Sequence, residues 1–268
     1  MSKKRVLFVT QEMQPYTEES AISSIMNQLA PYIYNKGYEI RVLMPKYGSI
    51  NERRHRLHEV VRLSGMNIIV DDDDFPLIIK VASLPGSRMQ VYFLDSEDFF
   101  KRKFIFHDED GKVFDDNADR MIFFCKGVME TVKKFGWAPD IIHCHGWMTS
   151  LVPLYLDKIY NSDPIFENAK LIYSVYPEDL GDGFNESFYQ KAAINDLEKD
   201  DMTDFQENGS IKLHYGAIKN AHGLISGSEN LEADVKALID EANVPVIQHS
   251  DEAYLDEYQN FYTSFIED

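Results

Sequence analysis

The stretch Arg5–Thr10 reads RVLFVT, with four apolar residues in a row. A strand with this composition is typical of a parallel sheet whose two faces are both covered. Apolar residues then recur at helical spacing over Ile22–Ile33, and Gly37 follows the end of that segment. A second apolar strand is expected at Glu39–Met44. This β-α-β order predicts the start of a doubly wound parallel sheet.

Composition narrows the classes of protein that the chain can belong to. Its 268 residues include 45 acidic and 27 basic side chains, a formal net charge of −18. That charge argues against binding to nucleic acid or to an anionic membrane surface. No apolar run reaches the roughly 20 residues that cross a bilayer. Cys125 and Cys144 are far apart in sequence, so we expect no disulfide framework and a reducing, cytoplasmic setting.

The segment from about residue 49 to 95 interrupts the α/β alternation. It contains three apolar runs, His58–Leu63, Leu77–Leu84 and Met89–Leu94. We interpret it as a β-hairpin or meander inserted at the sheet edge, with Asp71–Asp74 as a solvated turn. Calcium binding is the alternative for these four aspartates, but consecutive side chains lack the spacing of a ligand loop.

The α/β alternation resumes after this insertion and continues to the end of the chain. Pro177–Ile211 breaks the pattern and is predicted to be an irregular loop with short helices at the rim of a site. We therefore predict a single α/β domain over residues 1–268, ending in an aromatic helix. The expected elements are helices at Ala118–Val132, Trp147–Tyr160, Ile211–Asn220, Asn230–Glu241 and Glu252–Ile266, and strands at Asp140–His145, Lys170–Tyr176, His222–Ser226 and Val244–Gln248.

Ligands of open parallel sheets bind beyond the carboxyl ends of the strands. The first such loop, Gln11–Ala21, contains no glycine and carries Glu18 and Glu19. A pyrophosphate needs close backbone approach, which glycines permit, and it would be repelled by these carboxylates. The loop therefore argues against NAD, FAD and P-loop nucleotides, and we expect no cofactor.

The strand ending at His143-Cys144-His145 places both histidines on one face. Such a pair could ligate zinc, but no third ligand is recognisable by spacing, so we predict no metal. The pair would also suit contact with sugar hydroxyls, with Trp147 available for stacking. The simpler alternative is a strand end whose histidines bond to neighbouring loops. Farther along, Ser228 is predicted to cap the helix that follows it.

Two short basic groups, Arg53–Arg56 and Lys101–Lys103, are interleaved with acidic residues. We interpret both as solvated faces of the domain.

Several of these segments, in this order, resemble the bacterial glycogen and starch synthases. The resemblance extends from about Lys4 to Ile239. It rests on Phe8–Pro15 (FVTQEMQP), Val42–Pro45 (VLMP), Pro139–Trp147 (PDIIHCHGW) and Ala221–Ser228 (AHGLISGS). The family has the GT-B fold, in which two Rossmann-like domains face a cleft and glucose passes from ADP-glucose to an α-1,4-glucan. The resemblance implies a Rossmann-like N-terminal, acceptor-side domain, with the donor domain absent from this polypeptide.

The sequence departs from the family at three motifs. The family's Lys-Thr-Gly-Gly-Leu appears as Glu18–Ile22 (EESAI), and its His-x-His-Asp-Trp-His appears as His143–Met148 (HCHGWM). The family's Thr-Val-His-Asn appears as Ser174–Pro177 (SVYP). Transfer from a sugar nucleotide needs groups that stabilise the departing diphosphate, and each such loss typically costs about 3 kcal/mol of transition-state stabilisation. We therefore expect little transferase activity from the chain alone.

The resulting prediction is a carbohydrate-binding or partner-binding pseudoenzyme. An α-glucan or oligosaccharide is the expected ligand. The candidate contact residues, all at predicted strand tips, are Glu12, His143, His145, Trp147 and Tyr176. One alternative is an active transferase completed by a separately encoded GT-B donor-domain protein. Another is an acidic module that recruits basic protein partners.

Overall fold

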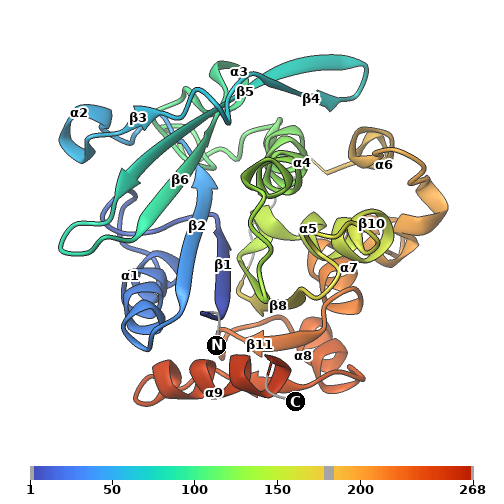
Figure 1. Ribbon diagram of the computed structural model, residues 1–268. Helices are drawn as coiled ribbons and strands as arrows, with labels where there is room; N and C mark the ends of the chain where they lie inside the picture. Colours follow the sequence, from blue (N-terminus) through green and yellow to red (C-terminus); the bar gives the residue numbers. More distant parts are fainter. Residues whose placement is uncertain (1–2, 178–183, 267–268) are drawn as a thin grey trace.

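The computed structural model describes residues 3–177 and 184–266. It contains a ten-stranded sheet with helices on both faces (Figure 1). The strand order is β12-β11-β8-β7-β1-β2-β6-β5-β3, and β4 also pairs with β5. The sheet strands are β1 (Arg5–Thr10), β2 (Glu39–Pro45), β3 (His58–Glu59), β4 (Met66–Val70), β5 (Asp73–Ser83), β6 (Gln90–Asp95), β7 (Ile141–His145), β8 (Lys170–Val175), β11 (Gly223–Ser226) and β12 (Val246–Gln248). A separate small hairpin joins β9 (Gln206–Glu207) to β10 (Ser210–Ile211).

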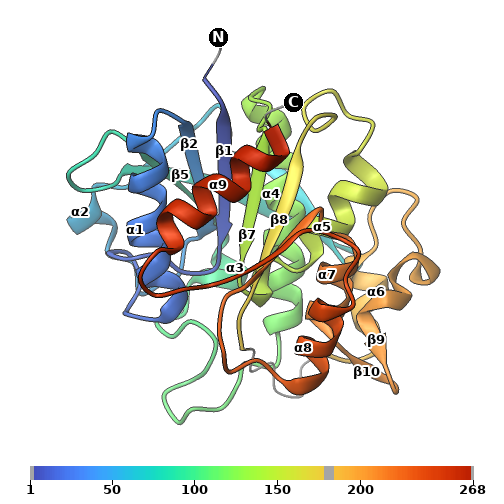
Figure 2. The same cartoon turned by 90° about the horizontal axis from the view of Figure 1, so that it is seen from below.

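Two helix layers enclose this sheet. Helices α1 and α9 cover one face, and α4, α5, α7 and α8 cover the other (Figures 1 and 2). The α-helices are α1 (Ala21–Asn35), α2 (Glu52–His55), α3 (Glu97–Phe100), α4 (Asn117–Phe135), α5 (Leu151–Tyr155), α6 (Ser187–Ala192), α7 (Leu213–Lys219), α8 (Ala233–Asp240) and α9 (Tyr254–Ile266). A 3₁₀ turn at Trp147–Thr149 precedes α5, a π-helical turn at Leu156–Tyr160 follows it, and a second 3₁₀ segment spans Lys199–Phe205.

The predicted α/β class and the edge meander are both confirmed. Neighbouring strands from β12 through β6 run parallel, whereas β5 is antiparallel to β6 and β3 is antiparallel to β5. In the core register, Phe8 of β1 lies between Val42 of β2 and His143 of β7. Chain connections leave β1 in one direction and β7 in the other, so the switch point lies between these two strands. Their carboxyl ends are where a ligand of such a sheet is expected.

Two local predictions differ from the structure. The strand β4 was not predicted, because only two of its five residues are buried. Ser228 does not cap α8: its hydroxyl accepts the N–H of Asn230 in a turn, and the helix begins at Ala233 after Glu232. A serine followed by acidic residues stabilises such a turn as readily as a helix start, so the prediction was wrong.

The predicted loop Pro177–Ile211 proves to contain short elements, which are α6, a 3₁₀ segment and the β9–β10 hairpin. Residues 178–183 of that loop lie outside the described part of the chain. Within residues 3–177 and 184–266, no helix combines the length and the hydropathy needed to traverse a bilayer.

Candidate functional site

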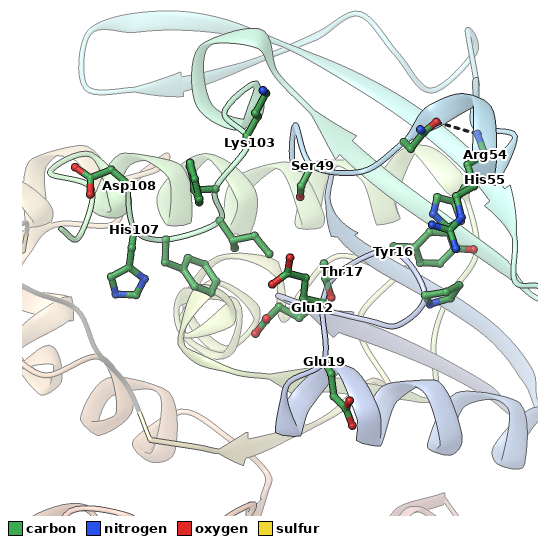
Figure 3. A pocket seen from close by; sticks show the side chains of 16 residues that line it. Glu12, Tyr16, Thr17, Glu19, Ser49, Arg54, His55, Lys103, His107 and Asp108 are labelled. Carbon is green, nitrogen blue, oxygen red and sulfur yellow. Dashed lines mark hydrogen bonds between the residues drawn. The ribbon is translucent and has the colours of Figure 1, made fainter. Parts of the chain in front are cut away.

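A pocket of about 490 Å³ opens beyond the carboxyl ends of β1 and β2. Its walls come from the β1–α1 loop, from the segment around α2, and from the loop that follows α3 (Figure 3). The lining residues are Glu12, Pro15, Tyr16, Thr17, Glu18, Glu19, Ser49, Asn51, Arg54, His55 and residues 103–108. The pocket thus occupies the position that the strand topology assigns to a ligand.

Glu12 is the predicted site residue that lines this pocket, and its carboxylate lies near the centre of the view in Figure 3. Its Oε2 accepts a hydrogen bond of 3.1 Å from Nε2 of Gln11. Burial raises the pKa of Glu12, and hydrogen bonds from Gln11 and Ser20 partly offset that rise. The pocket therefore contains an oriented, partly desolvated carboxyl group that can accept hydrogen bonds from a ligand.

The neighbouring strand end holds Gln11 in position. Gly146, directly after β7, has φ +84° and ψ 164°. A Cβ atom at this residue would lie 2.2 Å from Oε1 of Gln11, so only glycine leaves room for the amide. The same Oε1 accepts the N–H of Met148 at 3.4 Å. The orientation of Glu12 is thus linked through Gln11 to the end of β7.

The opposite wall is basic and aromatic. Tyr16 packs edge-on against His55, with ring centroids 5.0 Å apart, and against Phe93 at 4.9 Å. Burial raises the pKa of Tyr16 to about 12, and burial together with Arg54 lowers the pKa of His55. Asn51 starts α2 by accepting the N–H of Arg54 at 2.9 Å. This short helix thereby places a guanidinium and an imidazole at the pocket.

A buried arginine that the sequence reading did not single out fixes the third wall. Arg120 of α4 is fully buried, and its guanidinium donates to the carbonyls of Phe99 (2.8 Å) and Ile105 (2.5 Å). It also donates to the side chain of Asn117 at 2.7 Å. Burial lowers its pKa. The loop that carries Lys103 and Phe104 into the pocket is therefore attached to the scaffold through its backbone.

Trp147 reaches the pocket indirectly. It is 4% exposed, and its ring centroid lies 5.0 Å from that of Phe106, a lining residue, and 6.0 Å from that of Phe184. Phe104, on the same loop as Phe106, is 46% exposed. Apolar rings therefore border the carboxylate of Glu12, a combination suited to a ligand with both hydroxyl groups and apolar C–H faces.

The remaining predicted residues, His143, His145 and Tyr176, form a separate buried cluster. The two imidazole centroids are 3.8 Å apart, which confirms that both side chains share one face of β7. Nδ1 of His145 lies 3.1 Å from the Tyr176 hydroxyl, and the two rings stack. All three are buried, and none is among the described residues that line the pocket.

Helix α9 closes this cluster from outside. The hydroxyl of Tyr262 lies 2.6 Å from Nδ1 of His143, whose Nε2 lies 2.7 Å from the Ser174 hydroxyl. Burial lowers the pKa of both histidines, to about 3 for His145. They are therefore neutral core groups in the folded chain at pH 7. Within the described residues, no group of three or more His, Cys, Asp or Glu side chains is arranged to hold a metal ion.

The sequence reading assigned Arg54, His55 and Lys103 to solvated faces, whereas the structure brings them to the pocket. One signal for Arg54 and His55 was available, because they follow a strand whose carboxyl end lies beside β1. No comparable signal existed for Lys103, which reaches the pocket through the buried contact of Arg120.

Fold and pocket together define a Rossmann-like domain of the glycosyltransferase GT-B type. The sequence model described as "Starch synthase catalytic domain" matches residues 5–260. The chain therefore belongs to the starch synthase catalytic domain family.

Curated relatives are named glycogen synthase. That of Chlorobium limicola is 41% identical over 173 residues, which cover 64% of this chain and 35% of that protein. That of Chlorobaculum tepidum is 38% identical over 218 residues, which cover 81% of this chain and 44% of that protein. The matched part of the chain thus corresponds to between about a third and under half of each relative's length.

Among solved structures, the catalytic domain of Starch Synthase IV from Arabidopsis thaliana, bound to ADP and acarbose, has the same fold. Its TM-score is 0.71 at 17% identity, and the match covers 96% of this chain and 53% of that chain.

Proposed function

We propose that the pocket around Glu12 binds an α-1,4-glucan chain and that the domain does not transfer glucose by itself. The observation that carries the proposal is an oriented carboxylate, fixed by Gln11 and bordered by aromatic residues, at the topological switch point of the sheet. Sugars offer hydroxyl donors for such a carboxylate and apolar C–H faces for the rings. The acarbose bound to the related starch synthase supports a saccharide as the ligand class.

Electrostatics favours a neutral saccharide over a nucleotide sugar. Glu18 and Glu19 are exposed at the rim, and Asp108 lines the far side. Arg54 and Lys103 are the described cationic side chains that line the pocket, so its acidic groups outnumber them. A diphosphate would meet repulsion at the loop where the family carries a lysine, whereas an uncharged glucan would not. We therefore assign this chain a binding role.

Titration of the full chain with maltotetraose, followed by calorimetry and two-dimensional NMR, tests this proposal. Glu12→Gln keeps the size of the side chain and removes its charge, so we expect affinity to fall about 10- to 100-fold. Glu97→Gln, on an exposed residue of α3 outside the pocket, is the matched control and should bind like the unmodified chain. Absence of binding up to millimolar maltotetraose would refute the glucan proposal.

The non-catalytic part has its own test. The purified chain is incubated with ADP-glucose and maltotetraose, and products are separated by chain length. We expect no elongation above background. Elongation at a turnover typical of enzymes, about 1 per second or more, would overturn this part while leaving glucan binding intact.

A second candidate is favoured by the partial coverage of the relatives, of which the chain matches 35–44%. A separate donor-domain protein would then complete the cleft. Elongation from ADP-glucose should in that case appear only when both proteins are mixed, and a silent mixture would count against it.

A further inference from the structure

The strand β4 has one open side. Among the residues that the structure describes, it pairs with β5 alone, in an antiparallel register from Met66 opposite Leu77 to Val70 opposite Asp73. Its other side faces a second pocket, of about 510 Å³, between this hairpin, α4 and the end of α6. This pocket lies apart from the one around Glu12 and shares no lining residue with it.

The open side of β4 exposes backbone as well as side chains. Four consecutive residues, Met66 to Ile69, line the pocket. Successive side chains of a strand point to opposite faces, so four in a row cannot all project into one cavity. The pocket therefore follows the edge of the strand, where main-chain N–H and C=O groups lie.

The register identifies which groups point outward. In an antiparallel pair, alternate residues direct both backbone groups toward the partner strand or away from it. Asn67 lies opposite Pro76, which has no N–H, and the carbonyl of Ile69 accepts a bond of 2.9 Å from Lys126 Nζ instead of from β5. Asn67 and Ile69 therefore point away from β5. The N–H and C=O of Asn67 and the N–H of Ile69 remain available to another strand.

Lys126 gives this edge a rigid end. Its Nζ also donates to the carbonyls of Lys191 (2.8 Å) and Ala193 (2.7 Å), at the end of α6. Strand and helix are thus held by one ammonium group that is 4% exposed in total residue area. An incoming strand meets a preformed edge, so little ordering of this chain opposes its binding.

The surroundings identify the chemistry of the partner. Ile69 is 56% exposed, an apolar contact on the open strand. Asp71 and Asp72 line the pocket and are exposed, and Glu130 adds a third carboxylate. A second copy of this chain would bring another net charge of −18 to the same place, which disfavours self-association. A positively charged partner is favoured by the same field.

We propose that the open edge of β4 binds an extended, basic segment of another protein by β-strand addition, with alternate apolar residues packing on Ile69. Main-chain hydrogen bonds to Asn67 and Ile69 supply affinity, and the carboxylates of Asp71 and Asp72 select lysine and arginine. This function is independent of glucan binding.

The probe is a fluorescein-labelled octapeptide in which valine alternates with lysine, titrated with the full chain and followed by anisotropy. An octapeptide in which valine alternates with glutamate measures the charge requirement. Asn67→Pro removes an outward N–H while retaining the bonds to β5, because proline is tolerated on an edge strand. Asn67→Thr keeps the N–H and is the matched control.

We expect the lysine peptide to bind, the glutamate peptide not to bind, and Asn67→Pro to weaken binding at least about tenfold while Asn67→Thr does not. Should Asn67→Pro not fold, hydrogen exchange of the unmodified chain supplies the second readout: the amides of Asn67 and Ile69 should slow when the peptide is added. Equal binding by both variants, unchanged exchange at these amides, self-association through β4, or no binding of the lysine peptide up to millimolar concentration would each overturn the proposal.

Discussion

His143 and Tyr262, which are 119 positions apart in the chain, are joined by a buried contact of 2.6 Å between Nδ1 and the phenol oxygen. His143 belongs to the central strand β7, and Tyr262 belongs to the last helix. With Ser174 at its other nitrogen, the imidazole has both polar atoms satisfied inside the core. Helix α9 is therefore part of the hydrogen-bonded interior as well as a cover for its apolar surface.

Tyr262→Phe should lower the free energy of unfolding by about 1–3 kcal/mol, because it leaves a buried imidazole nitrogen without its partner. The matched control is Tyr254→Phe on the same helix, since the Tyr254 hydroxyl is buried without a hydrogen-bond partner. We expect that variant to change stability by less than about 0.5 kcal/mol. Urea denaturation at pH 7 measures both. Equal losses for the two variants would show that the contact with His143 contributes nothing.

Stability should fall as the pH drops from 7 to 5. Burial lowers the pKa of His145 to about 3 and that of His214 to about 4, so both stay neutral in the folded chain. In the unfolded chain they titrate near 6.5, so below that pH the unfolded state binds more protons. At pH 5 each histidine then costs about 2 kcal/mol of stability relative to pH 7. Urea denaturation at the two pH values measures the difference.

The variant His214→Gln isolates one contribution to that pH dependence. It sacrifices stability at both pH values, because His214 accepts or donates hydrogen bonds to Tyr173 and Tyr176. Its stability difference between pH 7 and pH 5 should nevertheless shrink by about 2 kcal/mol. An undiminished difference would contradict the assignment.

Gly146→Ala should destabilise the fold and weaken glucan binding together. The φ of +84° and ψ of 164° belong to a region that is almost restricted to glycine, and the new methyl group would overlap the Gln11 side chain. The matched control is Gly136→Ala, at φ +60° with no atom within 4 Å of the added carbon. We expect about 1 kcal/mol of lost stability for the control and at least about 2 kcal/mol more for Gly146→Ala.

Calorimetry with maltotetraose supplies the second readout, because displacement of Gln11 would release the carboxylate of Glu12. Unchanged affinity in a folded Gly146→Ala protein would mean that Gln11 does not position Glu12.

Removal of residues 252–268 should sharply reduce soluble yield and increase dye binding to exposed apolar surface. The deletion uncovers the cluster around His143 and takes away four buried side chains of α9, which are Tyr254, Tyr258, Phe261 and Tyr262. Asp256→Asn, which alters only exposed contacts with Tyr32 and Lys36, is the control and should remain soluble. A truncated protein as soluble as the full chain would disprove this role for α9.

The elements that sequence predicts well are those with a strong local pattern. Arg5–Thr10 is apolar without interruption because both faces of β1 are covered, and the apolar period of α4 matches its buried face. β4 lacks such a pattern, since its pairing with β5 depends on residues across a turn. The start of α8 was wrong for a related reason, because Ser228 closes a turn of its own.

The candidate site divides in the same way. Glu12 could be predicted as a pocket residue because it directly follows a buried strand. The contributions of Lys103 and Phe104 could not, because a guanidinium from a distant helix sets the path of their loop. His143 and His145 were placed on the correct face of β7. What covers them depends on the packing of a helix more than a hundred residues later in the chain.

The grip of Arg120 on its loop has an evolutionary consequence. The guanidinium holds carbonyl oxygens of Phe99 and Ile105, groups that every amino acid possesses. Mutations at the side chains of Lys103 and Phe104 therefore leave that anchor intact. This rim can diversify, or be redesigned for other sugars, while the framework beneath it stays the same.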